Sequence, residues 1–296
     1  MLASWLAAAR PRSLPIAISP VVVGAAFAYA HTGSLDFAVA GLILVASLLI
    51  QVITNMQNDV GYTIRGGERS GTRIGLPRAT ANGWLSVRQV RTAIVLLAVV
   101  ATALGLVLFT LRGWPVLAIG IASLMGALAY MGGPRPIAYT PFGELTVFVF
   151  FGLVAVIGTE WALTGEFGVA TVAAATGVGS IAAAALTVNN HRDIAHDRLV
   201  GRQTFAVVWG ASASRTMYAM LLFGPFALVP LIAFAAQSPT LLLPWVLLSQ
   251  AARLNHGFAH CRPGLAYNAI LFRTFLLGLA YAILLATGAI LGRVHF

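Results

Sequence analysis

Two polar segments of the chain combine carboxylate, amide and guanidinium side chains at helical spacing. The first contains Asn55 and Asp59, which are four residues apart and would share one face of a helix. The second contains Asn189, Asp193 and Asp197, again at intervals of four. Arginines follow both segments. Carboxylate oxygens suit Mg²⁺ and arginines suit phosphate, so this pattern predicts a site for a magnesium-bound diphosphate.

A simpler interpretation of each segment is a solvated helix face or an ion pair with a neighbouring arginine such as Arg192. The metal site is favoured because these segments lie in the two long polar connections of an otherwise apolar chain, and long connections are often functional. His191 and His196 are five residues apart and do not share a helix face. We interpret them as interfacial polar residues rather than zinc ligands.

A third segment, residues 132–140, contains two prolines that predict a rigid turn before Tyr139. An aromatic ring at the mouth of a cavity can stabilise a developing cation, although a tyrosine of the interfacial belt fits the spacing equally well. Glu144 and Glu160 fall within an apolar run, where carboxylates are functional candidates. Glu144 is near the end that carries the polar segments, whereas Glu160 is near the far end and can reach water there.

The composition excludes a water-soluble protein. Hydrophobic residues make up 59% of the 296 residues, charged residues only 9%, and the mean hydropathy is +0.89; soluble chains are about 25% charged. The chain contains no lysine, which excludes Schiff-base chemistry and a Walker A phosphate loop. Its one cysteine permits neither an internal disulfide nor a cysteine zinc cluster.

Apolar runs long enough for membrane helices of roughly 20 residues recur along the chain. They predict an all-α integral membrane protein with about nine transmembrane helices in one domain, residues 1–296. The first run resembles a signal peptide, but the later runs favour a retained helix. The runs are 14–30, 37–56, 92–111, 114–131, 142–163, 168–188, 214–236, 239–251 and 269–291.

The net charge of +10 is distributed unevenly between the predicted connections. With nine spans, all arginines except Arg112 and Arg293 fall on the side of the N-terminus. The positive-inside rule then places the N-terminus and both polar segments on the cytoplasmic side of the inner membrane. The same rule explains the basic composition, so a nucleic acid partner is not expected.

The polar segments also carry a family resemblance that covers nearly the whole chain. The sequence resembles the UbiA superfamily of membrane prenyltransferases, and within it the 1,4-dihydroxy-2-naphthoate prenyltransferases of menaquinone biosynthesis. Five motifs match in order: residues 9–15, Asn55 to Asp59 with residues 73–75, residues 132–140, Asn189 to Asp197 with residues 201–204, and Tyr267-Asn268.

The resemblance implies a bundle around a central cavity that opens sideways to lipid. It also implies Mg²⁺-dependent transfer of an isoprenyl chain from a polyprenyl diphosphate to an aromatic acceptor. By resemblance, Asp59, Glu68, Asp193 and Asp197 hold the metal, Asn55, Arg73, Arg78, Asn189 and Arg202 hold the diphosphate, and Tyr139 faces the allylic cation.

Three residues depart from the family pattern. Tyr62 and Glu68 occupy positions where the family usually has a second and a third aspartate, and Arg202 replaces a common lysine. Glu68 keeps the negative charge. Arginine keeps the phosphate-binding charge, whereas tyrosine removes a carboxylate. Another aromatic acceptor, such as 4-hydroxybenzoate, remains an alternative. A second alternative is a secondary transporter of an anionic substrate. The polar groups cluster at one face of the membrane rather than at its midplane, which favours an enzyme over a transporter.

Overall fold

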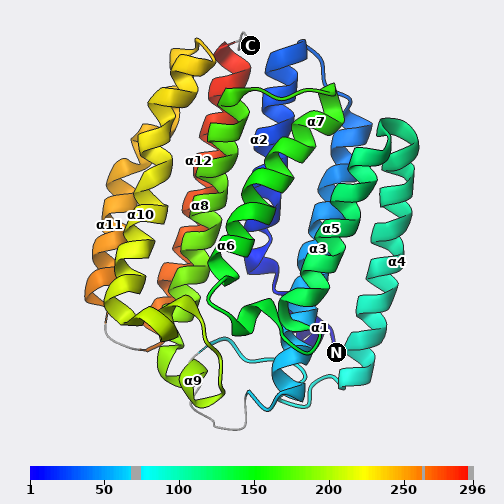
Figure 1. Ribbon diagram of the computed structural model, residues 1–296, viewed down its shortest axis with the longest axis vertical. Coiled ribbons are helices and arrows are strands. Elements are labelled where there is room, and N and C mark those ends of the chain that lie inside the picture. The colour runs from blue at the N-terminus through cyan, green and yellow to red at the C-terminus, as the bar shows by residue number, and fades with distance from the viewer. Residues whose placement is uncertain (68–74, 262–263, 293–296) are drawn as a thin grey trace.

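The computed structural model describes residues 1–67, 75–261 and 264–292 as a bundle of long, roughly aligned helices (Figure 1). Eight helices in these residues are long and apolar enough to cross a membrane. The α-helices are α1 (Leu2–Ala9), α2 (Pro15–Thr32), α3 (Phe37–Ile64), α4 (Val87–Arg112), α5 (Trp114–Met131), α6 (Gly143–Phe148), α7 (Gly158–Thr164), α8 (Val169–Arg192), α9 (Ile194–Leu199), α10 (Phe205–Ala235), α11 (Leu248–His260) and α12 (Ala266–Gly292). Four short elements are η1 (Pro11–Ser13), η2 (Ile137–Tyr139), η3 (Val149–Ile157) and η4 (Pro239–Leu247).

The predicted spans correspond to these helices, with differences at particular residues. The fifth run is one continuous span in which α6 and α7 flank the π-helical η3. The eighth run does not form one long helix: it folds as η4 followed by α11. Pro244 lies inside η4 and lacks the amide hydrogen that a regular α-helix needs there, which explains the tighter first part.

Helix α8 is the packing centre of the bundle and contacts α10, α12, α6 and η3. Its sequence is rich in alanine and glycine, and small residues allow helix backbones to approach closely. At Gly179 a Cβ atom would lie 2.5 Å from the Phe148 carbonyl oxygen, and at Gly152 it would lie 2.6 Å from that of Ala175. The two glycines therefore set the distance between α8 and the fifth span.

The polar segments of the sequence gather at one end of this bundle, next to α1 and α9 (Figure 1). Helix α3 extends to Ile64, so Asn55 and Asp59 share a helix face as predicted. The second segment is not one continuous helix: α8 ends before Asp193, and α9 begins after it. The Asp197 amide still donates to the Asp193 carbonyl at 2.7 Å, so these two residues stay one turn apart.

Candidate functional site

A cavity of about 410 Å³ extends from this polar end into the bundle. Towards the far end its walls are apolar, with side chains such as Leu108, Val116 and Phe150. No aspartate or glutamate of the described segments lines it. The cavity therefore combines a cationic, polar end with an apolar interior. The arginines that line it are Arg10, Arg12, Arg78, Arg192 and Arg202.

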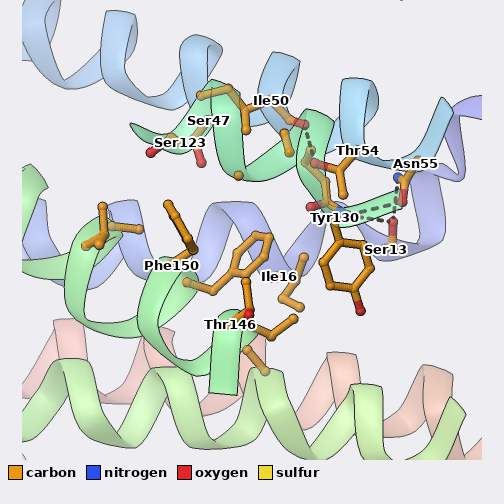
Figure 2. A pocket seen from close by; sticks show the side chains of 18 of the residues that line it. Ser13, Ile16, Ser47, Ile50, Thr54, Asn55, Ser123, Tyr130, Thr146 and Phe150 are labelled. Atoms are coloured by element: carbon orange, nitrogen blue, oxygen red, sulfur yellow. Dashed lines mark hydrogen bonds between the residues drawn. The ribbon is translucent and has the colours of Figure 1, made fainter. Parts of the chain in front are cut away.

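Figure 2 shows part of this cavity between α3, α5 and the fifth span. The Tyr130 ring extends into the space beside Asn55 and Ser13, while Phe150 and Ile16 supply apolar surface nearby. The cavity thus offers hydroxyl and amide groups at its polar end and aromatic and aliphatic groups deeper inside.

Asn55 joins the N-terminal segment to α3. Its Nδ2 donates to the Ala9 carbonyl at 2.8 Å and to Ser13 Oγ at 3.0 Å, and its Oδ1 accepts from Gln51 at 3.3 Å. Asn55 is buried and lines the cavity. Its contacts hold the segment that carries Arg10 in place beside the cavity.

Asp59 is fully buried, but its carboxylate is engaged by the loop that follows α3. Oδ2 accepts from the Ala79 amide at 2.8 Å, and Oδ1 accepts from the Thr80 amide at 2.8 Å and from the Thr80 hydroxyl. The neighbouring Arg78 donates from Nη1 to the Asn58 carbonyl at 3.0 Å and lines the cavity. Asp59 therefore fixes the loop that presents Arg78.

We expect Asp59→Asn to destabilise the protein by about 1–3 kcal/mol, because the new amide group would face a buried N–H instead of accepting from it. A thermal melt of purified protein in detergent checks this. Asp36→Asn is the control: Asp36 caps α3 by accepting from the Val39 amide at 3.1 Å, and asparagine caps helices equally well. Its ion pair with Arg112 is partly exposed and contributes little to stability. Equal melting temperatures for the two variants would contradict the assignment.

Asp193 is also buried, and Arg192 binds it through two hydrogen bonds of 2.8 Å and 2.6 Å. The same guanidinium donates to Asn268 Oδ1 at 2.6 Å and to Asn189 Oδ1 at 2.8 Å. Arg192, Asn189 and Asn268 line the cavity, whereas Asp193 lies behind them. One arginine thus connects the end of α8 to the start of α12.

Asp197 pairs with Arg202, and both are buried. Arg202 Nη1 donates to Asp197 Oδ1 at 2.7 Å, and Nε donates to the Ala138 carbonyl at 3.0 Å. Burial raises the pKa of the Asp197 carboxyl above its usual value of 3.8, although the Arg202 charge opposes the shift. Asp197 Oδ2 is buried and has no hydrogen-bond partner among the residues described.

The two polar segments meet through Tyr62 and Arg202 rather than through their carboxylates. Arg202 Nη1 donates to the Tyr62 hydroxyl as well as to Asp197. The guanidinium carbons of Arg78 and Arg202 lie 3.7 Å and 5.0 Å from the centre of the Tyr62 ring. Tyr62 and Arg202, two of the residues that the resemblance marked as departures, are therefore in direct contact, and Tyr62 lines the cavity.

Tyr139 lies beside the cavity, and its neighbour Ala138 lines it. The Tyr139 ring has two guanidinium carbons near its centre, Arg65 at 5.6 Å and Arg202 at 5.7 Å. Its role towards an allylic cation stays a prediction. Tyr62 and Tyr130 are the tyrosines that line the cavity, which the sequence spacing did not indicate.

The remaining polar candidates occupy other positions. Glu144 is buried and accepts from Asn190 at 2.9 Å, near the polar end. Glu160 is fully buried at the far end, 3.7 Å from His31, so the expectation that it reaches water there is wrong. His191 packs against the aromatic rings of Phe258 and Tyr267.

Magnesium prefers oxygen ligands, and the predicted metal ligands differ in whether their carboxylate oxygens already accept hydrogen bonds. Within 1–67, 75–261 and 264–292, no three histidine, cysteine, aspartate or glutamate side chains gather closely enough to hold a metal ion. Asp197 Oδ2 fits a divalent ion as a buried carboxylate oxygen without a partner in these ranges. Glu68 and Arg73, predicted for metal and diphosphate, lie outside the described residues.

Several lining residues were not predicted as site residues, although the sequence held signals for some of them. Arg10 and Arg12 belong to the first motif, Arg192 to the second segment and Asn268 to the last motif. Tyr130 carries no such signal, because it lies in an apolar run and only the packing of α5 directs it into the cavity.

Fold and site together define a polytopic membrane protein with a cavity that is apolar inside and cationic at one end. A model of the UbiA prenyltransferase family matches residues 17–276. The chain belongs to this family, and it is a membrane prenyltransferase.

Curated relatives and solved structures agree with this assignment. The 1,4-dihydroxy-2-naphthoate octaprenyltransferase of Escherichia coli is 33% identical over 85% of this chain and 82% of its own length. The Mycobacterium tuberculosis protein of that name is 35% identical over 84% and 82%. A UbiA homolog from Archaeoglobus fulgidus, solved bound to DMAPP and Mg²⁺, shares the fold with a TM-score of 0.70 at 16% identity, covering 97% of this chain and 99% of that one.

Proposed function

We propose that this protein transfers an isoprenyl chain from a polyprenyl diphosphate to 1,4-dihydroxy-2-naphthoate, in a reaction that uses Mg²⁺. The observation that carries the proposal is the cavity itself. Five arginines and no described carboxylate line it, and an apolar interior continues from that end. A prenyl diphosphate has the same division between an anionic group and a long apolar chain.

The residues of the cavity suit the ionisation of such a substrate. The allylic C–O bond breaks, its electron pair leaves with the diphosphate, and the arginines neutralise the charge that develops. The apolar walls keep water away from the allylic carbon until an electron-rich ring carbon of the acceptor attacks it. That ring carbon then loses its carboxylate as CO₂, and the electron pair of the broken C–C bond restores the aromatic ring.

A divalent ion, when bound, would add a Lewis acid at the leaving group. Asp197 is the residue best suited to hold it, because its Oδ2 is buried and has no partner among the described residues. Asp193 and Asp59 remain predicted metal ligands. To coordinate the ion, each would have to give up a hydrogen bond, from Arg192 to Asp193 and from the Ala79 amide to Asp59.

The choice of acceptor rests on the naphthoate octaprenyltransferases among the relatives. Prenylation of 4-hydroxybenzoate by the same site is the nearest alternative. A transporter of an anionic substrate is less well supported, because the polar groups gather at one end of the bundle rather than midway along it.

The decisive experiment incubates purified protein with a panel of aromatic acceptors and prenyl diphosphates and identifies the products by mass spectrometry. Prenylated naphthoquinol product in Mg²⁺ supports the proposal, and full activity in EDTA would remove the metal from it. Exclusive use of 4-hydroxybenzoate would change the acceptor. Counterflow of substrate in liposomes without turnover would indicate a transporter.

We also propose that the N-terminus and the polar end face the cytoplasm, because the arginines gather there. Cys261, the only cysteine of the chain, follows α11 at this end and reports the orientation. We expect a membrane-impermeant maleimide to label inverted membrane vesicles and not intact cells. Labelling of intact cells would show that the protein has the opposite orientation in the membrane.

A further inference from the structure

We infer that Gln51 recognises the aromatic acceptor, and that its Oε1 atom accepts a hydrogen bond from a hydroxyl group on the acceptor ring. The inference rests on the proposed function, in which an aromatic hydroxy acid enters the cavity beside the prenyl diphosphate. Gln51 lies in α3, lines the cavity and is only 6% exposed. Its Oε1 atom is buried without a hydrogen-bond partner among the described residues. A buried oxygen of this kind calls for a donor from outside that part of the chain.

The orientation of the Gln51 amide follows from the hydrogen bonds of Asn55. Asn55 Nδ2 donates to the Ala9 carbonyl at 2.8 Å, and a carbonyl oxygen only accepts, so the Asn55 amide nitrogen faces Ala9. Asn55 Oδ1 is then turned towards Gln51 and accepts from Gln51 Nε2 at 3.3 Å. If the Gln51 amide were reversed, two oxygens would face each other. Oε1 is therefore the atom of the Gln51 amide that is left for another molecule.

The hydroxyl of Ser13 does not supply the missing donor. Its one hydrogen is directed to the Arg10 carbonyl at 2.9 Å, while its oxygen accepts from Asn55 Nδ2 at 3.0 Å and from Gln51 Nε2 at 3.3 Å. These bonds use the single donor and both acceptor positions of the hydroxyl. Ser13, Gln51 and Asn55 thus hold one another in place between η1 and α3, and Gln51 Oε1 is the oxygen of this group that lacks a donor.

The missing partner has to be a hydrogen-bond donor, and the two substrates differ in this respect. A diphosphate is an anion that accepts hydrogen bonds, and a prenyl chain has no polar hydrogen, whereas an aromatic hydroxy acid carries O–H groups. In 1,4-dihydroxy-2-naphthoate, the 1-hydroxyl lies beside the carboxylate and donates to it within the molecule. The hydrogen of the 4-hydroxyl stays free. The 4-hydroxyl is therefore the group that suits Gln51 Oε1.

The position of Gln51 agrees with this assignment. Gln51 precedes Asp59 by eight residues of α3, which corresponds to about 12 Å along the helix axis, so it lies deeper in the bundle than the polar end. The Tyr130 ring extends into the cavity beside Ser13 and Asn55 (Figure 2), and both of these residues accept from Gln51. An aromatic ring and an unpaired hydrogen-bond acceptor thus lie in one region of the cavity, where a flat phenolic ring can use both.

The test compares the binding of 4-hydroxy-2-naphthoate and 2-naphthoate, which differ by one hydroxyl group, to purified full-length protein. Calorimetry is done in Mg²⁺ with farnesyl thiodiphosphate, an unreactive prenyl donor. We expect wild-type protein to bind the hydroxylated compound about 10-fold more tightly, because 2-naphthoate leaves Oε1 unpaired. Gln51→Met has a similar length but no amide oxygen, so it should bind the two compounds alike. The 1-hydroxy isomer, whose hydroxyl bonds its own carboxylate, should bind like 2-naphthoate to both proteins.

Thr54→Val is the matched control. Thr54 also lines the cavity from α3, and its hydroxyl donates to the Ile50 carbonyl of the same helix at 2.8 Å, so its loss does not disturb Gln51. This variant should keep the wild-type preference for the hydroxylated compound. A preference that survives in Gln51→Met, or one that is lost in Thr54→Val, would overturn the inference. Thermal melts verify that each variant is folded.

The wild-type comparison keeps the inference falsifiable if Gln51→Met does not fold, because equal wild-type affinities for 4-hydroxy-2-naphthoate and 2-naphthoate would overturn it. If no naphthoate binds, the same comparison with 4-hydroxybenzoate and benzoate decides. The result is separable from that of the proposed function, because no turnover is measured. A preference that depends on Gln51, in a protein that prenylates no acceptor, would refute the proposed function alone. Prenylation of the naphthoate without such a preference would refute the inference alone.

Discussion

Arg202→Gln is expected to reduce prenyl transfer at least about 100-fold, with a rise in KM for the prenyl diphosphate. The substitution removes one of the five guanidinium groups that line the cavity, and it frees Tyr62 and Ala138 from the bonds that Arg202 makes. It also leaves Asp197 as a buried carboxylate without its cation. Loss of one partner from a buried pair costs about 3–5 kcal/mol.

Steady-state kinetics and thermal melts separate these two effects. In the double variant Arg202→Gln with Asp197→Asn, the unpaired charge is gone, so we expect the melting temperature to recover. Its transfer rate is compared with that of Asp197→Asn alone, because Asp197 is itself the proposed metal ligand, and we expect it to be lower still. Arg202→Lys keeps the charge but has a single nitrogen in place of the planar fork, so it should retain part of the activity. If the double variant transferred the prenyl chain as fast as Asp197→Asn alone, Arg202 would have a purely structural role.

Gly179→Val is expected to destabilise the folded protein by about 3 kcal/mol, and the yield of folded protein should fall with it. A Cβ atom at Gly179 would lie 2.5 Å from the Phe148 carbonyl oxygen and 2.9 Å from the Gly152 Cα atom. Both obstacles are backbone atoms of the fifth span, so no side-chain rotation can make room.

Gly41→Val in α3 is the control, since Gly41 is exposed and a Cβ atom there meets nothing within 4 Å. Size-exclusion profiles and thermal melts of both proteins in the same detergent give the comparison. If the Gly179→Val protein had the same melting temperature as the Gly41→Val control, α8 would be able to move away from the fifth span at little cost in free energy.

The three aspartates of the site already accept hydrogen bonds from other residues of the chain, and this affects how a metal ion can bind. Asp59 holds a loop, Asp193 is paired with Arg192, and Asp197 is paired with Arg202. Each carboxylate therefore organises the residues that line the cavity. An anionic ligand that competes for Arg192 and Arg202 would release carboxylate oxygens at the same time, which is the condition under which a divalent ion gains ligands.

The sequence alone determined the class of fold and predicted two polar segments as the site. Membrane helices follow from apolar runs of sufficient length, because backbone groups in hydrocarbon must bond within their own segment. By the same reasoning, the polar segments at Asn55–Asp59 and Asn189–Asp197 interrupt the apolar pattern, which indicates a functional role for them. The family motifs then pointed to a membrane prenyltransferase, which the family match confirmed.

The tertiary structure decided which side chains meet. Tyr62 and Arg202 are 140 residues apart, and their hydrogen bond depends on how α3 packs near the loop after α9. The Thr80 amide donates a hydrogen bond to the Asp59 carboxylate, and the packing of α5 directs the Tyr130 side chain into the cavity. Hydropathy and spacing are local properties of the chain, whereas the direction of a buried side chain and its partner are set by packing between distant segments.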